Sequence, residues 1–309
     1  MFRQYRRRST NIVFVIFRLM LSLVIFAALL GGIYSAYKHF SGLDPLKLNP
    51  QTVFSNLLSR VNPITPSPIP KEVFSFILVA DSHSDNANLK NALTQAKPSN
   101  PEFIIGLGDY SEVGTVDELK KAKQEFDNLG LRYFLAVGDH DLWDCRNRSL
   151  PSDCNFKEIF GPPYQSFIFN QSFKFIILNN SDNYIGMGEE QLEWLSKEIQ
   201  SAKDAKLKGV YVFVQEPFYH PSSDHVMGRI EKDLKNQARS LIRTLKDGGV
   251  KKVFAGDTHY FSEYTEPETG LPMVTVGAIT SQRNPQTPRY ALVLVYTDGS
   301  TKVEDVEIK

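Results

Sequence analysis

Acidic, amide and imidazole side chains follow five apolar runs of the sequence, each at the point where the run ends. In chain order they are Asp81-Ser82-His83, Gly108-Asp109, Gly138-Asp139-His140-Asp141, Gln215-Glu216 and Gly256-Asp257-Thr258-His259. One such residue is typical of an ordinary turn. Five sets, holding three of the six histidines, indicate a shared site. Open α/β sheets bind ligands at the carboxyl ends of their strands, and carboxylates and imidazoles are common metal ligands.

The elements that must position these residues begin with alternating strands and helices. Val73–Ala80 is almost continuously apolar, which is typical of a buried strand. Thr115 and Glu118 have the spacing of a capping box and predict a helix that runs to about Leu129. The other elements expected in this half are a helix over Asn86–Lys97 and strands over Phe103–Leu107 and Arg132–Val137.

The second half is richer in strands. We expect Asp141–Pro163 to be irregular, followed by a hairpin made of Tyr164–Phe169 and Phe173–Leu178. Helices are predicted over Gly188–Ala205 and Glu231–Lys246. The remaining predicted strands are Val210–Val214, Lys252–Ala255, Tyr260–Tyr264, Met273–Val276, Tyr290–Val295 and Thr301–Glu307. The order of elements predicts an α/β fold with mixed sheets covered by helices.

The series of strand-end residues resembles that of the calcineurin-like metallophosphoesterase family. The family series runs Asp-x-His, Gly-Asp, Gly-Asn-His-Asp or Glu, a His two residues before Pro, and Gly-His-x-His. The resemblance spans about residues 73–308. It implies an α/β/β/α sandwich of two mixed sheets with two metals at one edge. It also implies hydrolysis of a phosphate mono- or diester through a metal-activated water.

The resemblance implies that one metal is held by Asp81, His83, Asp109 and His259, and all four residue types match the family. Two imidazoles and two carboxylates suit Mn, Fe or Zn. Asp109 is the residue expected to bridge to a second ion.

The second metal position departs from the family. The family uses the bridging Asp, an Asn and two His, whereas the positions here are Asp109, Asp139, Gln215 and Asp257. The two additional carboxylates lower the formal charge of the site by two units, which disfavours a phosphate dianion. An all-oxygen donor set suits Mg²⁺, Mn²⁺ or Ca²⁺, if any metal binds.

Three interpretations of the altered position stay open. The second site keeps a harder metal, or only the first site is occupied, or the fold is a catalytically degenerate module with a binding or structural role at the membrane. His220 before Pro221 is either a replacement ligand or a loop residue, and Glu216 either binds metal or faces solvent.

His140 takes the family's general-acid position, with Asp141 as the carboxylate expected to orient it. An imidazole with such a partner can donate a proton near neutral pH. The alternative is a buried or capping histidine. Tyr110 and Tyr260 flank the motifs and are candidate substrate contacts.

The N-terminal region predicts a membrane anchor. Four arginines in residues 3–8 precede Arg18 and an uncharged run, Leu19–Tyr37, whose helix would be roughly 28 Å long. A cleaved signal peptide is the alternative. The arginines predict a cytoplasmic N-terminus and an extracytoplasmic C-terminal domain.

The expected organisation is a cytoplasmic tip and transmembrane helix over 1–40, a Pro-rich linker over 41–70 with a short helix at Val53–Val61, and a phosphoesterase domain over 71–309. Cys145 and Cys154 either form a disulfide or remain thiols. The 309 residues carry a formal net charge of zero, which gives no indication of nucleic-acid binding. The expected partners are a phosphoester substrate and the membrane.

Overall fold

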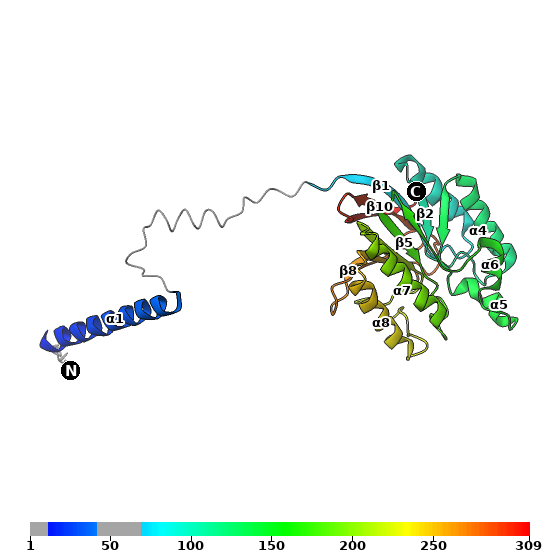
Figure 1. The fold of residues 1–309 in the computed structure, drawn as a ribbon. Coiled ribbons are helices and arrows are strands. Elements are labelled where there is room, and N and C mark those ends of the chain that lie inside the picture. Colours follow the sequence, from blue (N-terminus) through cyan, green and yellow to red (C-terminus); the bar gives the residue numbers. More distant parts are fainter. Residues whose placement is uncertain (1–11, 42–68) are drawn as a thin grey trace, which may run out of the picture. The chain divides into compact units, whose positions relative to one another are not determined.

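The computed structural model describes residues 12–41 and 69–309 of the chain. These residues belong to two units, which are described separately. The first contains helix α1 (Ile12–Ser41), and the second contains the sheets and the remaining helices (Figure 1). The predicted helix at 53–61, the arginines of residues 3–8 and most of the Pro-rich linker lie outside the described residues.

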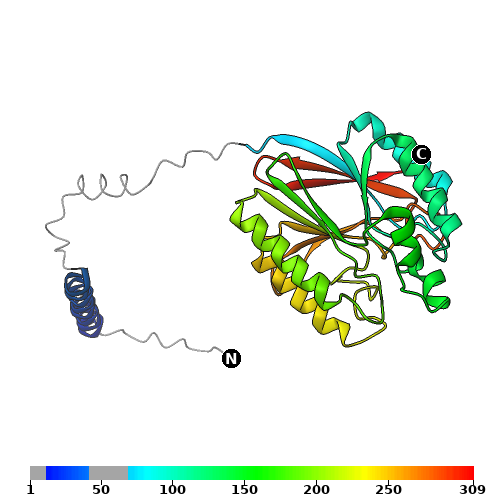
Figure 2. The same cartoon turned by 45° about the vertical axis from the view of Figure 1, so that its right-hand side comes forward.

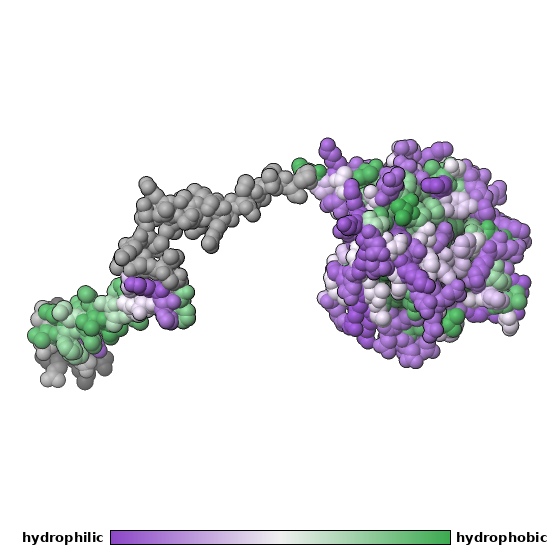
Figure 3. All heavy atoms as spheres, viewed as in Figure 1, coloured by the Kyte–Doolittle hydropathy of each residue, from purple (hydrophilic) through white to green (hydrophobic). Residues whose placement is uncertain are grey.

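Helix α1 contains the predicted span and extends beyond it on both sides. Its segment Val13–Phe40 contains an 18-residue window with a mean hydropathy of 2.7 and is long and apolar enough to cross a membrane. Its apolar side chains are exposed, and Figure 3 shows them as a green surface on this helix. Arg18 lies within the helix, with its guanidinium 4.9 Å from the centre of the Phe14 ring. The helix is longer than predicted because the apolar residues before Arg18 continue it.

The first sheet has five strands and places β1 at its centre. In spatial order these are β11 (Thr301–Glu307), β10 (Arg289–Tyr296), β1 (Glu72–Val79), β2 (Phe103–Gly106) and β3 (Arg132–Leu135). Strands β1, β2 and β3 are parallel, whereas β10 is antiparallel to both β1 and β11. The carboxyl ends of β1, β2 and β3 therefore lie at the same edge.

The second sheet has six strands, and it also combines parallel with antiparallel strands. In spatial order these are β4 (Gln165–Phe169), β5 (Phe173–Ile177), β6 (Gly209–Val214), β7 (Lys252–Ala255), β9 (Pro272–Thr275) and β8 (Ser262–Thr265). Its four inner strands are parallel, and β4 and β8 pair antiparallel at the margins. Both sheets are mixed, as the sequence predicts.

The sheets pack face to face around a core rich in phenylalanine. Phe76 stacks on Phe103 at 5.3 Å within the first sheet, and Phe213 stacks on Phe254 at 5.2 Å within the second. The two layers meet edge to face, with Phe76 6.0 Å from Phe213. Such edge-to-face and offset pairs are the arrangements that aromatic rings favour.

Four longer helices cover the outer faces of the sandwich (Figures 1 and 2). They are α3 (Asn86–Ala96) and α4 (Val116–Leu129) on the first sheet, and α7 (Glu189–Asp204) and α8 (Leu234–Asp247) on the second. The capping box of Thr115 and Glu118 is formed at the start of α4. The observed architecture is the predicted α/β/β/α sandwich.

The segment expected to be irregular, Asp141–Pro163, instead contains short helices. They are the 3-10 turn η2 (His140–Leu142), α5 (Trp143–Asn147) and α6 (Cys154–Phe160); a further turn, η1 (Lys97–Ser99), follows α3. Helices of five and seven residues are too short to leave a periodic apolar pattern.

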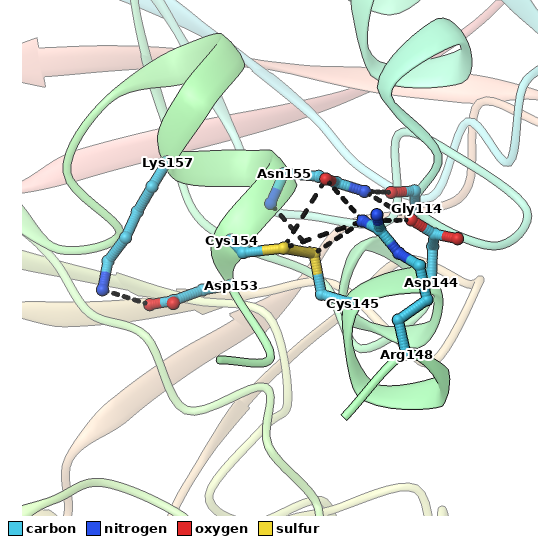
Figure 4. Close-up of a disulfide and its surroundings, with 8 residues drawn as sticks. All are labelled: Gly114, Asp144, Cys145, Arg148, Asp153, Cys154, Asn155 and Lys157. Carbon is cyan, nitrogen blue, oxygen red and sulfur yellow. Dashed lines mark hydrogen bonds and ion pairs between the residues drawn. A yellow bond between two sulfur atoms is a disulfide. The ribbon is translucent and has the colours of Figure 1, made fainter. Parts of the chain in front are cut away.

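A disulfide joins Cys145 at α5 to Cys154 at α6 (Figure 4). Asn155 braces the same segment, since its Nδ2 donates to the Gly114 carbonyl and to Asp144 Oδ2, both at 2.8 Å. The bridge therefore ties together the loop that follows β3, which carries His140 and Trp143.

Replacing both cysteines with serine should lower the melting temperature by about 4–12 °C. Closing a short loop contributes about 2–3 kcal/mol, and each kcal/mol shifts a domain of this size by about 2–4 °C. Thermal unfolding with and without dithiothreitol measures the effect, and the double-serine variant should not respond to the reductant. An equal melting temperature for oxidised and reduced wild type would contradict the expectation.

Candidate metal centre

The polar residues that follow β1, β2, β3, β6 and β7 converge at the edge where these parallel strands end. Backbone hydrogen bonds hold the loops together: Asp81 N donates to the Gly108 carbonyl at 3.1 Å, and His83 N donates to the Asp109 carbonyl at 2.9 Å. Across the second sheet, Gly256 N donates to the Gln215 carbonyl at 3.0 Å. The strand ends of both sheets therefore contribute to one site.

Five of the site residues have a left-handed backbone although none is glycine. Their φ angles are 55° for Asp81, 43° for His83, 56° for Asp109, 63° for Asp257 and 59° for His259. Such conformations cost on the order of 1–3 kcal/mol each and concentrate at functional sites. The surrounding loops hold these residues so that their side chains face a common point.

Gly108 and Gly138 permit the close approach of the loops after β2 and β3. Gly108 has φ +99°, and a Cβ there would lie 2.7 Å from Gln215 Cγ and 2.8 Å from Gly138 Cα. A Cβ on Gly138 would overlap the backbone nitrogen and carboxylate of Asp109. Both glycines are therefore needed for Asp109 to reach the middle of the site.

The first cluster contains Asp81, His83 and His259, whose ligand atoms all lie within 4.8 Å of one another. The Nε2 atoms of the two histidines face each other at 3.1 Å, and Asp109 Oδ2 lies 3.7 Å from His83 Nε2. Two nitrogens bound to one ion at about 2.0–2.1 Å would have a similar separation. The structure thus brings together all four residues predicted for the first metal.

The environments of the two histidines in this cluster favour their neutral forms, which can bind metal. His259 Nδ1 lies 3.1 Å from the Arg283 carbonyl, a contact in which Nδ1–H donates and Nε2 keeps its lone pair. Burial, with the neighbouring His140 and His259, lowers the pKa of His83 to about 3. Burial also lowers the pKa of His259.

The second cluster consists of Asp109, Asp139 and Asp257, whose carboxylate oxygens also lie within 4.8 Å of one another. The side chain of Gln215 is 1% exposed, and its Nε2 lies 3.4, 3.4 and 3.2 Å from oxygens of these three residues. The four positions expected for the second metal are therefore adjacent, with no imidazole among them.

Burial, together with mutual repulsion, raises the pKa values of the carboxylates at this edge. Burial and then the Asp257 carboxylate raise the pKa of Asp81 well above its usual value. Burial and the carboxylates of Asp139 and Asp81 do the same for the pKa of Asp109. Burial and Asp257 raise the pKa of Asp139. Cations at this edge would relieve this cost.

His140 is oriented by a backbone carbonyl and not by Asp141. Its Nδ1 lies 2.7 Å from the Glu112 carbonyl oxygen, and its ring stacks on Trp143 with 4.0 Å between centroids. Asp141 Oδ1 accepts from Ser111 Oγ and from two backbone amides, while Oδ2 accepts from Gly138 N at 3.0 Å. Asp141 therefore fixes the loops after β2 and β3, and burial raises its pKa to about 6.

A pocket of about 830 Å³ opens over both clusters. Its wall includes residues that sequence reasoning missed: Trp143, His225, Arg229 and Arg283. His225 Nδ1 lies 3.8 Å from Asp257 Oδ2, although nothing in the sequence distinguishes His225 from a surface residue. These residues come from loops without periodic patterns, so only the three-dimensional structure places them here.

Four further candidates have clear environments. His220 is a loop residue whose Nδ1 accepts from Ser222 N and Ser223 N at 3.1 and 2.9 Å, and Tyr260 OH lies 3.2 Å from it.

Tyr110 is buried in the core beside Phe126, so the expected substrate contact is wrong for it. Glu216 does not face solvent; burial and Asp257 raise its pKa to about 8.

Comparison with known proteins identifies the family. The family model for calcineurin-like phosphoesterases matches residues 74–261, which contain every strand end described above. The chain belongs to the calcineurin-like phosphoesterase family. The resemblance stated from the sequence motifs is thereby confirmed.

Known members of the calcineurin-like phosphoesterase family resemble the chain in sequence or fold. A probable glycerophosphodiester phosphodiesterase from Arcobacter nitrofigilis is 27% identical over 140 residues, which cover 44% of this chain and 49% of that relative. The aligned segment thus spans about half of the relative's length. A dimetal phosphatase from Danio rerio is similar in structure, with TM-score 0.59, 15% identity and coverage of 77% of this chain and 100% of that one. A purple acid phosphatase from yellow lupin has TM-score 0.59, 12% identity and coverage of 78% and 53%.

Members of the calcineurin-like phosphoesterase family use divalent metals, and the two clusters fit such ions to different degrees. The first offers neutral imidazole nitrogens and carboxylates, which suit transition metals. The second offers carboxylates and one amide, which suit harder ions. The chain thus has a phosphoesterase fold and retains residue clusters that could hold metal.

Metal-free protein should lose stability as the pH rises from about 6.5 to about 8, where unfolded histidines are already neutral and the lowered pKa values of His83 and His259 no longer contribute. The folded pKa values of Asp81, Asp109 and Asp139 are raised, and that of Asp141 is about 6, whereas an unfolded Asp titrates near 4. A raised folded pKa stabilises the fold below the unfolded pKa, and this contribution is lost as pH rises through the folded pKa. Melting temperatures in EDTA at several pH values test this.

Added Mn²⁺ should raise the melting temperature more at pH 7.5 than at pH 5, because deprotonated carboxylates bind metal. Asp139→Asn should raise the stability of the EDTA-treated protein at pH 7.5, whereas the matched Asp127→Asn variant on exposed α4 should not. A melting temperature in EDTA that increases between pH 6.5 and pH 8 would contradict the carboxylate repulsion.

Proposed function

We propose that the chain is a membrane-anchored, metal-dependent hydrolase of phosphate mono- or diesters. The observation that carries the proposal is the pair of His83 and His259 Nε2 atoms, which face each other at 3.1 Å beside Asp81 and Asp109. Neutral imidazoles converging on buried carboxylates provide the mixed nitrogen and oxygen donors of a transition-metal site. The family match supports phosphoester chemistry for that site.

Asp81, His83, Asp109 and His259 would hold Mn, Fe or Zn, and Asp109, Asp139, Gln215 and Asp257 surround the second position. A bound divalent metal supplies Lewis-acid chemistry, which activates water near neutral pH and neutralises charge on phosphoryl oxygens. The protein contributes the fixed geometry, since strained loops and two glycines hold the ligands before any ion arrives.

His140 is assigned as the general acid for the leaving oxygen. Its Nδ1–H donates to the Glu112 carbonyl, which fixes the orientation of the ring and leaves Nε2–H as the proton to be transferred. The Trp143 ring packs against it and restricts its rotation. Asp141 is assigned as a positioning residue, because its bonds to Gly138 N and Ser111 hold the loop that carries His140.

Arg229 and Arg283 support an anionic substrate. Both line the pocket above the clusters, and guanidinium groups bind phosphate oxygens with charge-assisted hydrogen bonds. A phosphodiester is the first substrate class to test, since the curated relative is described as a probable glycerophosphodiester phosphodiesterase.

The anchor is proposed from α1 and the preceding arginines. The helix would cross the membrane with residues 1–11 in the cytoplasm, so that the domain over 71–309 lies outside, joined by a linker over 41–70. The Cys145–Cys154 disulfide supports this orientation, because disulfides persist in oxidising compartments.

A second candidate function is a catalytically degenerate module that binds ligands at the membrane. The specific observation in its favour is that Asp139, Gln215 and Asp257 replace one amide and two imidazoles of the family pattern. The extra negative charge opposes a phosphate dianion at the second position.

Purified full-length protein should hydrolyse bis(p-nitrophenyl) phosphate in the presence of Mn²⁺, Fe²⁺ or Zn²⁺. Asp109→Asn and His83→Asn should each reduce kcat/KM at least about 100-fold, and His140→Gln about 100-fold or more through kcat. Asp127→Asn, on the exposed face of α4, is the control and should remain fully active.

The degenerate module would be supported by an opposite pattern. The wild type would be inactive with every metal, and hydrolysis would arise only in the triple variant Asp139→Asn, Gln215→His, Asp257→His. Hydrolysis at the same rate in the wild type and in the His83→Asn variant would contradict both functions.

The proposed orientation predicts that protease added to intact spheroplasts of an expressing bacterium degrades the C-terminal domain. Immunoblots against that domain should lose the full-length band, while a cytoplasmic control protein survives. Replacing all four arginines of residues 3–8 with glutamate should reduce this accessibility. Protection of the domain in intact spheroplasts, with digestion only after lysis, would contradict the orientation.

A further inference from the structure

The second cluster combines three carboxylates that come from three separate strand ends. Asp109 follows β2, Asp139 follows β3 and Asp257 follows β7, and their oxygens lie within 4.8 Å of one another. Oxygens bound to a single ion at about 2.3–2.6 Å can be no more than about 5 Å apart. The carboxylates therefore have the spacing of ligands around one cation. A cluster of acidic residues would not by itself indicate a site.

The independent observation is the amide of Gln215, which comes from a fourth strand end, after β6. Its side chain is 1% exposed. The Nε2 lies 3.4 Å from Asp109 Oδ2, 3.4 Å from Asp139 Oδ1 and 3.2 Å from Asp257 Oδ1. Its Oε1 is buried and has no hydrogen-bond partner among residues 12–41 and 69–309. The amide group thus stands between the carboxylates with its oxygen unsatisfied.

This arrangement is a poor resting state for a neutral amide. An NH₂ group has two hydrogens and cannot serve three acceptors with good geometry. It also cannot neutralise three carboxylates, and the buried Oε1 carries its full desolvation penalty. Rotation about the last side-chain torsion exchanges Oε1 and Nε2 while the group keeps its shape. The exchange would place four oxygens around one point, which is unfavourable without a cation and favourable with one.

We propose that Gln215, with Asp109, Asp139 and Asp257, forms an all-oxygen site selective for a hard divalent cation, Mg²⁺ or Ca²⁺. With a cation bound, the Gln215 amide presents Oε1 to it, through a rotation that exchanges Oε1 with the Nε2 that faces the carboxylates. The inference deepens the proposed function, on which it rests for the role of Asp109. It makes the centre a pair of unlike sites, with a nitrogen-containing site at His83 and His259 beside an oxygen-only site.

The donor chemistry supports this selectivity. Carboxylate and amide oxygens favour Mg²⁺ and Ca²⁺, whereas Zn²⁺ and Fe²⁺ favour sites that include imidazole. His225 is the imidazole to test, since its Nδ1 lies 3.8 Å from Asp257 Oδ2 and its side chain is 46% exposed. It pairs with the outer side of Asp257 and is not among the residues whose ligand atoms form the cluster.

The test uses the full chain in detergent with His83→Asn, which weakens the first site. Tb³⁺, a hard probe ion, is titrated and its luminescence followed on excitation of tryptophan, because Trp143 lines the same pocket. We expect saturable luminescence from one ion, displaced by Ca²⁺ or Mg²⁺. Gln215→Leu should weaken Tb³⁺ binding at least tenfold, because it removes the amide oxygen.

Metal content provides the second readout. After dialysis against equal concentrations of Mg²⁺, Ca²⁺, Mn²⁺ and Zn²⁺, Gln215→His should raise the ratio of Zn to Ca plus Mg at least tenfold. The same substitution at Gln124, which is exposed on α4, is the matched control and should leave the ratio unchanged. His225→Asn should also leave it unchanged.

Three results would overturn the inference. Either no hard ion binds, or Tb³⁺ binds with equal affinity with and without Gln215→Leu, or the ratio of bound metals depends on His225. Its failure is separable from that of the proposed function. Hydrolysis of the phosphodiester with no hard ion bound would remove the inference alone. Gln215-dependent ion binding without any hydrolysis would remove the proposed function alone.

Discussion

The burial of carboxylates against one another at the shared edge of the two sheets is the constraint on which the site depends. Asp81 and Asp109 are almost fully buried, and Asp139 and Asp257 face them from neighbouring loops. Repulsion among these groups opposes folding in their ionised form. The fold tolerates this because the phenylalanine core fixes both sheets, and because the strand-end loops are held by backbone bonds, left-handed residues and the glycines at 108 and 138. A cation is the natural counterpart to such a preorganised negative site.

Much of this architecture could be predicted from the sequence, because its signals are local. Buried strands leave apolar runs, and the side chains at their ends must meet wherever the strands are parallel neighbours. These local signals indicate a shared site, and the family resemblance then implies that Asp81, His83, Asp109 and His259 hold the first metal. The capping box at Thr115 and mixed sheets covered by helices followed from similarly local patterns, whereas the two-sheet sandwich was implied by the family resemblance.

The parts that could not be predicted depend on loops or on backbone groups. The partner of His140 is the Glu112 carbonyl, and a carbonyl leaves no signature in residue types. Asp141 was expected beside His140 because of its sequence position, yet its side chain accepts from backbone amides of the loops after β2 and β3. His225, Arg229 and Arg283 reach the pocket from loops without any periodicity. Loop residues of this kind are where sequence patterns carry least information.

The two metal positions of the proposed centre differ in their donor groups and in their charge. With both positions filled, the four carboxylates balance two divalent cations, so the metals retain little net charge with which to attract a phosphate dianion. Attraction must then come from elsewhere in the pocket, and Arg229 and Arg283 are the cationic side chains that line it. Because Asp109 belongs to both clusters, an ion in one position also reduces the repulsion felt in the other. The replacement of imidazoles by Asp257 and Gln215 therefore changes more than the identity of one metal. In the proposed function, substrate capture would fall to the arginines, and the shared Asp109 would make the loading of either position dependent on the other.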